Sequence, residues 1–277
     1  MSNKAMSLKA KIRSLAKQNN MSAQVVLQNY MFERFLERLS KSEYKNKFIL
    51  KGGMLIAAIV GINNRSTMDM DITIKDYPLE SGSLSKAINV ISNVHIDDNV
   101  KFTFLKIESI REDDDYGGFR ASIQSEYDTI ITPMHIDFTT GDAITPGEIF
   151  FSFKRILDNK VIGVWSYNIE TVLAEKFETI LRRGEFSTRP RDFYDIYTLT
   201  KTQNFNRELF IHAVRKTALQ RGTSYIFENI EKRIVGIENS DNLHRQWSNY
   251  TRNYHYAELI TYADIISVLK KLSSHFI

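Results

Sequence analysis

Cysteine is absent from this chain of 277 residues, which excludes disulfide bonds and thiolate metal sites. Proline and glycine are few, at 4 and 12 residues, so we expect no long flexible linker. No apolar stretch approaches the roughly 20 residues that a membrane helix needs, and the basic N-terminus lacks the apolar core of a signal peptide. These absences predict a cytoplasmic protein with no membrane partner.

The residues that are present are those of a globular protein. Hydrophobic residues make up 43% of the chain and charged residues 25%, which is the usual balance for a packed core with a solvated surface. The net charge of +4 is a weak indication of an anionic partner. The six histidines show no zinc-ligand spacing, and no P-loop sequence is found.

Hydrophobic periodicity changes along the chain. Apolar residues at helical spacing predict a helix over residues 22–40, with Ser22 as its N-cap, and a short buried helix over 54–60. Alternating patterns predict strands at 67–74, 101–110, 118–127, 134–140, 148–156 and 160–167. Helical patterns dominate from residue 168 onward. We therefore expect an α+β fold, with a mixed sheet and flanking helices over residues 1–165 and a helical bundle over residues 166–277.

Two aspartates stand one residue apart in the first of these strands. Side chains at i and i+2 of a strand project from the same face, so Asp69 and Asp71 would lie together and repel each other. A solvated strand end is the simpler explanation, because D-x-D is a common pattern. The alternative is a site for Mg²⁺ or Mn²⁺, which bind carboxylate oxygens. Asp137, in the strand at 134–140, could join the pair as a third carboxylate if the two strands are neighbours.

The residues before the aspartates favour a phosphate-binding function. Gly52 and Gly53 precede the helix at 54–60, and backbone N–H groups at a helix start attract anions. Arg65 and Thr67 come shortly before the aspartates, and Thr67 shares their face of the strand. These four residues are our candidates for nucleotide binding.

Four stretches in this order resemble a known family. "LKGG" at 50–53 and "RSTMDMDI" at 65–72 look like the first motif of the DNA polymerase beta-like nucleotidyltransferases. Together with "LAEKFETILRR" at 173–183 and "RPRDFYDIYTL" at 189–199, they more closely resemble the AbiEii toxins of type IV toxin–antitoxin and abortive-infection systems. One departure is that Gly-Gly stands where superfamily members often have Gly-Ser.

The resemblance implies functional residues in the helical part. It places a functional lysine at Lys176, which we expect to bind the triphosphate, and an active-site aspartate at Asp192, with Asp195 in a supporting role. Without it, Lys176 would be read as an exposed lysine and Asp192 as a favourable charge at a helix start. Nearby arginines are equally consistent with a solvated loop and with a phosphate-binding rim. These are Arg182, Arg183, Arg189 and Arg191.

The resemblance also implies a function. It is that of a Mg²⁺-dependent toxin that transfers a nucleotide from a nucleoside triphosphate to an acceptor, for which the 3′ end of tRNA is the most attractive candidate. A separately encoded antitoxin would counter it, without forming a stable protein complex. Two alternatives stay open: a nucleotide-binding toxin or sensor that transfers nothing, and phosphoryl transfer from the γ-phosphate. If all the motifs serve one reaction, we expect them to meet in one cleft.

Overall fold

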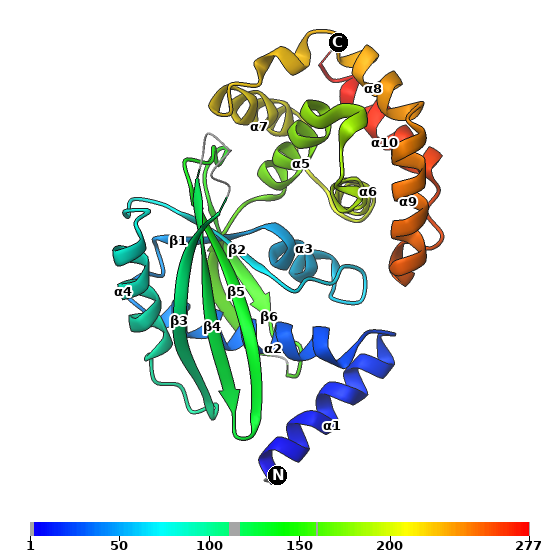
Figure 1. Cartoon of the computed structure of the whole chain (residues 1–277). Coiled ribbons are helices and arrows are strands. Elements are labelled where there is room, and N and C mark those ends of the chain that lie inside the picture. The colour runs from blue at the N-terminus through cyan, green and yellow to red at the C-terminus, as the bar shows by residue number, and fades with distance from the viewer. Residues whose placement is uncertain (1–2, 111–116, 159, 277) are drawn as a thin grey trace. The chain divides into compact units, whose positions relative to one another are not determined.

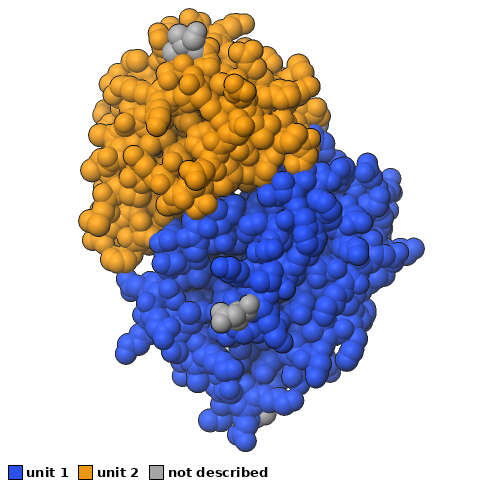
Figure 2. Space-filling model, turned by 180° about the vertical axis from the view of Figure 1, so that it is seen from behind, with its two compact units in different colours: residues 1–141, 148–167 blue, residues 142–147, 168–277 orange. Residues whose placement is uncertain are grey.

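The computed structural model describes residues 3–110, 117–158 and 160–276 (Figure 1). The chain divides into two compact units, which are coloured separately in Figure 2. Unit 1 holds residues 1–141 and 148–167, and unit 2 holds residues 142–147 and 168–277. Unit 2 therefore includes a short segment that precedes the last two strands of unit 1. Among the described residues, no helix is both long and apolar enough to cross a membrane.

Unit 1 is built on a mixed sheet whose strand order is β3-β4-β5-β2-β1-β7-β6. Pairing is parallel between β2 and β5 and between β1 and β7, and antiparallel between the other neighbours. The strands are β1 (Phe48–Lys51), β2 (Met70–Ile74), β3 (Val100–Ile110), β4 (Gly118–Tyr127), β5 (Ile130–Thr140), β6 (Ile149–Lys154) and β7 (Val161–Ser166).

Four helices accompany this sheet: α1 (Asn3–Gln18), α2 (Ala23–Lys41), α3 (Gly52–Val60) and α4 (Ser81–Ser92). Helix α2 begins at the predicted N-cap, where the Ser22 hydroxyl accepts the N–H of Val25. It packs against β5 and β7, while α3 packs against β1 and β2. The core between helices and sheet is closed by fully buried side chains, among them Phe32, Phe35, Phe48, Ile72, Ile136 and Phe138.

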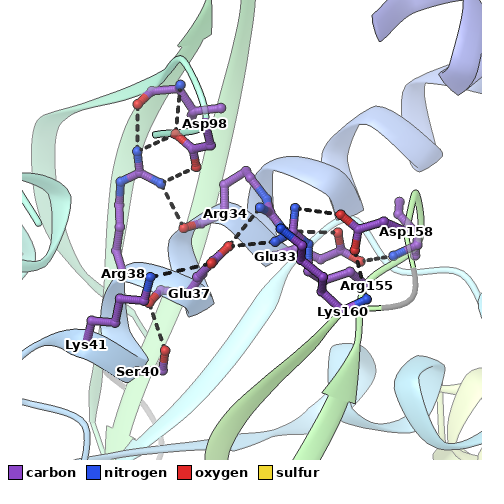
Figure 3. Close-up of polar contacts among 12 residues, drawn as sticks. Glu33, Arg34, Glu37, Arg38, Ser40, Lys41, Asp98, Arg155, Asp158 and Lys160 are labelled. Carbon is purple, nitrogen blue, oxygen red and sulfur yellow. Dashed lines mark hydrogen bonds and ion pairs between the residues drawn. The ribbon is translucent and has the colours of Figure 1, made fainter. Parts of the chain in front are cut away.

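A buried charge network fastens α2 to two other parts of unit 1 (Figure 3). Glu33 accepts the backbone N–H of Ile156, and Glu37 accepts hydrogen bonds from Arg34 and from Arg155 beyond β6. Nearer the end of the helix, Arg38 forms a two-pronged ion pair with Asp98, which lies just before β3. A further ion pair joins Arg155 to Asp158. These hydrogen bonds and ion pairs hold the helix to the β6–β7 hairpin and to the start of β3.

Unit 2 is helical, as the periodicity predicts. Its elements are α5 (Ile169–Arg183), η1 (Gly184–Phe186), α6 (Pro190–Thr202), α7 (Arg207–Gln220), η2 (Ser224–Phe227), α8 (Ile230–Glu238), α9 (Asp241–Asn253), η3 (His255–Ala257) and α10 (Tyr262–Ser273). Helix α5 starts at Asn168, whose side chain accepts the N–H of Thr171. Helix α6 starts at Pro190, a residue suited to the first helical position.

The α+β class with a mixed sheet and a helical C-terminal part is confirmed. Several strand boundaries differ from the prediction: β5 begins at Ile130 instead of residue 134, and β6 ends at Lys154 instead of residue 156. The strand expected at 67–74 begins at Met70, and Met68 is 40% exposed instead of lying in the core. Within β2 the alternation holds, because Met70, Ile72 and Ile74 are buried.

Candidate functional site

A row of charged residues crosses four neighbouring strands of the sheet. The register places Lys51 of β1 opposite Asp71 of β2, and Asp71 opposite Asp137 of β5. It also places Asp137 opposite Arg120 of β4. Residues opposite each other on adjacent strands project from the same face, with Cβ atoms roughly 5 Å apart. The row therefore has two carboxylates at its centre and a cation on each side. Asp71 and Asp137 lie on neighbouring strands, as the prediction required.

The start of α3 meets the carboxylate of Asp71. The N–H of Gly53 donates to Asp71 Oδ2 at 3.3 Å. Gly52 has φ +63°, in the left-handed region, and a Cβ on it would lie 2.1 Å from the same oxygen. Only glycine allows this approach without displacing the carboxylate. At least one of the N–H groups that we expected to face phosphate is thus directed at Asp71.

Arg65 and Thr67 lie beneath the start of α3. Both are buried, at 2% and 4% exposure. A Cβ on Gly53 would lie 2.5 Å from a terminal nitrogen of Arg65 and 2.8 Å from Thr67 Oγ1. The serine that is common at this turn in the superfamily would therefore compete with Arg65 and Thr67 for space, which accounts for the second glycine here.

Asp69 lies at the edge of this group, just before β2. It is half-buried, and its backbone is held by Thr67, whose hydroxyl donates to the Asp69 carbonyl oxygen at 3.1 Å. The carbonyl oxygen of Thr67 in turn accepts a hydrogen bond from the side chain of Asn29 on α2, at 2.9 Å. Thr67 therefore shapes the turn that presents Asp69.

Asp137 is bound on both oxygens by Arg120. The guanidinium donates from Nε to Oδ1 and from a terminal nitrogen to Oδ2, each at 2.7 Å. The Asp137 side chain is 10% exposed, whereas that of Arg120 is 41% exposed. The hydrogen bonds to Asp137 raise the pKa of Arg120, and the charges of Asp137, Asp69 and Asp71 act in the same direction. Arg120 therefore lies within the electrostatic reach of all three carboxylates.

The donor set fits a hard divalent cation in part. In the part of the chain that the structure describes, no group of three or more His, Cys, Asp or Glu side chains is arranged to hold a metal ion. Asp69 and Asp71 provide two carboxylates, while both oxygens of Asp137 contact Arg120. Mg²⁺ is commonly bound by one or two carboxylates together with substrate phosphates, so Asp69 and Asp71 fit that role.

Lys176 and Asp192 are brought together in unit 2. The ammonium of Lys176 on α5 lies 2.5 Å from Asp192 Oδ1 and 3.2 Å from Asp195 Oδ2, both on α6. The side chains of Asp192 and Asp195 are 7% and 0% exposed. Lys176 is 19% exposed, so it is not the exposed lysine that sequence alone would favour. Asp195, for which we expected a supporting role, is paired with Lys176.

The four arginines near this group differ in their surroundings. Arg182 donates to the fully buried Glu178, and Arg191 donates to the hydroxyl of Tyr254. Arg189 is 48% exposed and lies 3.9 Å from Asp192. Arg183 is half-buried. Arg189 is therefore the member of the group best placed to meet a ligand from solvent.

Sequence reasoning missed Arg120 and Lys51 as members of the row. Lys51 is 8% exposed, and its ammonium lies over the ring of Tyr167 at 5.6 Å. The sequence did offer a signal for Lys51, which directly precedes Gly52. Arg120 depends on the register between β4 and β5, which no single-sequence pattern fixes.

Comparison with known proteins identifies the family of the chain. A family model described as "Nucleotidyl transferase AbiEii toxin, Type IV TA system" matches residues 34–266. The match covers both units and reaches further into the C-terminal helices than the four motifs do. A search of curated proteins finds no match.

Two solved structures have a similar fold. One is of a proposed nucleotidyltransferase from H. pylori, with 12% identity and a TM-score of 0.51, and covers 92% of this chain and 96% of that one. The other is of JHP933 from Helicobacter pylori, with 15% identity and a TM-score of 0.51, and covers 92% and 91%. At these identities the likeness shows the fold alone, whereas the family match spans most of the sequence. The chain therefore belongs to the AbiEii family of nucleotidyltransferase toxins of type IV toxin–antitoxin systems.

Proposed function

We propose that this toxin transfers a nucleoside monophosphate from a nucleoside triphosphate to the 3′ end of an RNA, with tRNA as the acceptor. The observation that supports this most is the pair Asp69 and Asp71 at the start of α3, with Asp137 in register beside Asp71. In the transfer, the acceptor hydroxyl oxygen bonds to the α-phosphorus. The bond from that phosphorus to its bridging oxygen breaks, pyrophosphate leaves, and the hydroxyl proton passes to water.

The residues of unit 1 would hold the reacting phosphates. Asp69 and Asp71 would hold Mg²⁺, or Mn²⁺ in its place, which when bound neutralises charge on the phosphates and lowers the pKa of the acceptor hydroxyl. The positive end of α3 attracts the same phosphates, and Gly52 and Gly53 keep that end close to the carboxylates. Arg65 and Thr67 contribute by shaping this turn.

Unit 2 has its own candidates for contacts with nucleotide and acceptor phosphates. Lys176, held by Asp192 and Asp195, supplies a fixed cation, and a triphosphate would share it with those carboxylates. The exposed Arg189 would contact acceptor phosphates. The net charge of +4 is a weak indication in the same direction, toward an anionic acceptor.

The family match supports a proposal for the biological role. We propose that the transfer arrests growth in the cytoplasm during phage infection, and that a separately encoded antitoxin opposes it without a stable protein complex. Co-expression and purification would test the last point. Recovery of the antitoxin bound to the toxin at equal amounts would refute it.

Incubation with α-labelled and γ-labelled nucleotides tests the reaction itself. Each of ATP, GTP, CTP and UTP is offered with Mg²⁺ and total tRNA, and the RNA is then separated from free nucleotide. Label from the α position on the RNA supports our proposal. Label from the γ position on RNA or protein indicates phosphoryl transfer instead, and binding of nucleotide without transfer of either label indicates a sensor.

A further inference from the structure

One cation of the charged row has a feature that a structural ion pair does not need. Arg120 grips Asp137 with two hydrogen bonds of 2.7 Å, yet 41% of its side chain stays exposed to solvent. The contact neutralises the largely buried Asp137, but the exposed part of Arg120 remains open to a second partner. The sheet also has ample apolar packing at this point, since Ile136 and Phe138 on either side of Asp137 are fully buried. Apolar packing therefore forms the sheet at this point, and the role of Arg120 is to compensate the charge of Asp137.

The contact does have a clear effect on the charges at the site. Asp71 and Asp137 lie opposite each other in register, and like charges at that separation repel. With Asp137 bound by Arg120, the number of carboxylates open to a cation falls from three to two.

The chemistry of Arg120 fits a second partner equally well. A guanidinium presents its donors as a planar fork that matches a phosphate as well as a carboxylate. Arg120 lies within the electrostatic reach of Asp69 and Asp71, so it stands beside the place where the phosphates of a nucleotide would enter. A long, half-exposed side chain can change partner without any movement of the backbone.

We propose that Arg120 is an exchangeable counter-ion of the site. In the free toxin, the guanidinium of Arg120 is hydrogen-bonded to Asp137. When a nucleoside triphosphate binds, the guanidinium forms its hydrogen bonds with a phosphate instead. Asp137 is then released as the third carboxylate for the cation. This inference rests on the proposed function for its ligand, a nucleoside triphosphate. Under this proposal, all three carboxylates are available to the cation only when the nucleotide is bound.

The test measures binding of Mn²⁺ alone to the full chain, by electron paramagnetic resonance of the free ion. Arg120→Gln should bind Mn²⁺ about tenfold more tightly than the wild type, equivalent to ~1.4 kcal/mol. Adding Asp137→Asn to that variant should remove the gain. Lys106→Gln is the matched control, because Lys106 is an exposed cation of β3 paired with Glu108 and not with Asp137. An equal gain in the control would show general charge removal and overturn the proposal.

A second arm measures nucleotide binding by equilibrium dialysis with ATP, GTP, CTP and UTP in turn. Arg120→Gln should weaken binding of the preferred nucleotide by about tenfold, and Arg120→Lys should weaken it less, because lysine keeps the charge but loses the fork. Unchanged nucleotide affinity, or unchanged Mn²⁺ affinity, in Arg120→Gln overturns the proposal.

The two proposals can fail separately. Both binding results can be obtained even if the wild type transfers no label, in which case the proposed transfer fails and the exchange stands. If the wild type transfers label but Arg120→Gln leaves Mn²⁺ binding unchanged, the proposed transfer stands and the proposed exchange of Arg120 fails. A circular dichroism spectrum and melting curve like those of the wild type would show that Arg120→Gln is folded.

Discussion

Asp71 and Asp137 lie directly opposite each other on two neighbouring parallel strands, although 66 residues separate them in the chain. Two carboxylates at that spacing destabilise each other unless positive charge compensates them. The compensation is divided: Asp71 faces the N-terminus of α3, and Asp137 is bound by Arg120. Each carboxylate thus has its own source of positive charge before any ligand arrives.

Asp69→Ala should abolish nucleotide transfer and toxicity while leaving the fold intact. The change removes one of two carboxylates available to a cation and eases repulsion in the free protein, so stability should hold or rise slightly. Labelled transfer and growth arrest measure the first effect, and thermal melting measures the second. Full toxicity of the variant would contradict the assignment, and a large fall in melting temperature would instead indicate a structural role.

Gly52→Ala should be inactive and less stable. The new methyl group meets Asp71 Oδ2, and a left-handed backbone costs a residue with a Cβ about 1–2 kcal/mol. The matched control is Gly82→Ala on α4, where a Cβ meets nothing within 4 Å. Urea unfolding should separate the two variants by at least about 1 kcal/mol. Equal stability and activity in both would show that the approach of Gly52 to Asp71 is unimportant.

Lys176→Ala should lose both activity and stability, and Lys176→Arg should keep more of each. The alanine leaves Asp195 buried without its lysine, and breaking a buried ion pair typically costs about 3–5 kcal/mol. Adding Asp195→Asn to the alanine variant should restore part of the stability but none of the activity. Thermal melting and labelled transfer would be compared across the set. Wild-type behaviour of Lys176→Ala would show that Lys176 has neither role.

Glu33→Gln should change how stability depends on pH. Burial raises the pKa of Glu33 from 4.5 to about 8, against the opposing effects of the Ile156 N–H and of Arg34 and Arg155. The folded protein then binds this proton more tightly than the unfolded chain, so the free energy of unfolding falls as pH rises from about 4.5 to 8. In the glutamine variant the free energy of unfolding should not fall in this way. Its stability relative to the wild type should therefore increase as pH rises to about 8.

Urea unfolding between pH 5 and 9 measures this effect. The exposed Glu108, changed to glutamine, serves as the control and should leave the pH dependence unaltered. A constant difference between Glu33→Gln and the wild type over this range would mean that Glu33 ionises normally in the folded protein.

Arg189→Gln should weaken RNA binding and reduce its dependence on salt, while leaving nucleotide binding unchanged. Arg189 is half exposed, and each lost phosphate contact should lower the slope of log affinity against log salt concentration by about 1. Lys216→Gln, at an exposed position on α7, is the control. Filter binding of tRNA at several salt concentrations would show the difference. Identical slopes in the two variants would remove Arg189 from the acceptor surface.

The sequence predicts the faces of the strands well and their neighbours poorly. Alternation in 134–140 correctly separates buried Ile136 from the face of Asp137, because that pattern depends only on local geometry. The position of Arg120 depends on the pairing of β4 with β5, and a shift of one residue would turn Arg120 away from Asp137. Its place in the row could therefore be found only from the sheet.

In the helical motifs, too, the sequence predicts local geometry but not the packing of one element against another. Spacing alone places Asp192 and Asp195 on one side of α6. The burial of both carboxylates and their shared contact with Lys176 depend on how α5 packs against α6, which local propensity does not determine. For the same reason, the structure gives Lys176 a role in neutralising buried charge that periodicity did not suggest.

The parallel pairing of β2 with β5 also has a consequence for synthesis of the toxin. Asp69 and Asp71 leave the ribosome long before Asp137, and β2 gains its β5 neighbour only after the intervening α4, β3 and β4 have been made. Pairings between distant segments form slowly, because the loop must close first. A half-made chain therefore holds the D-x-D pair without the strand beside it.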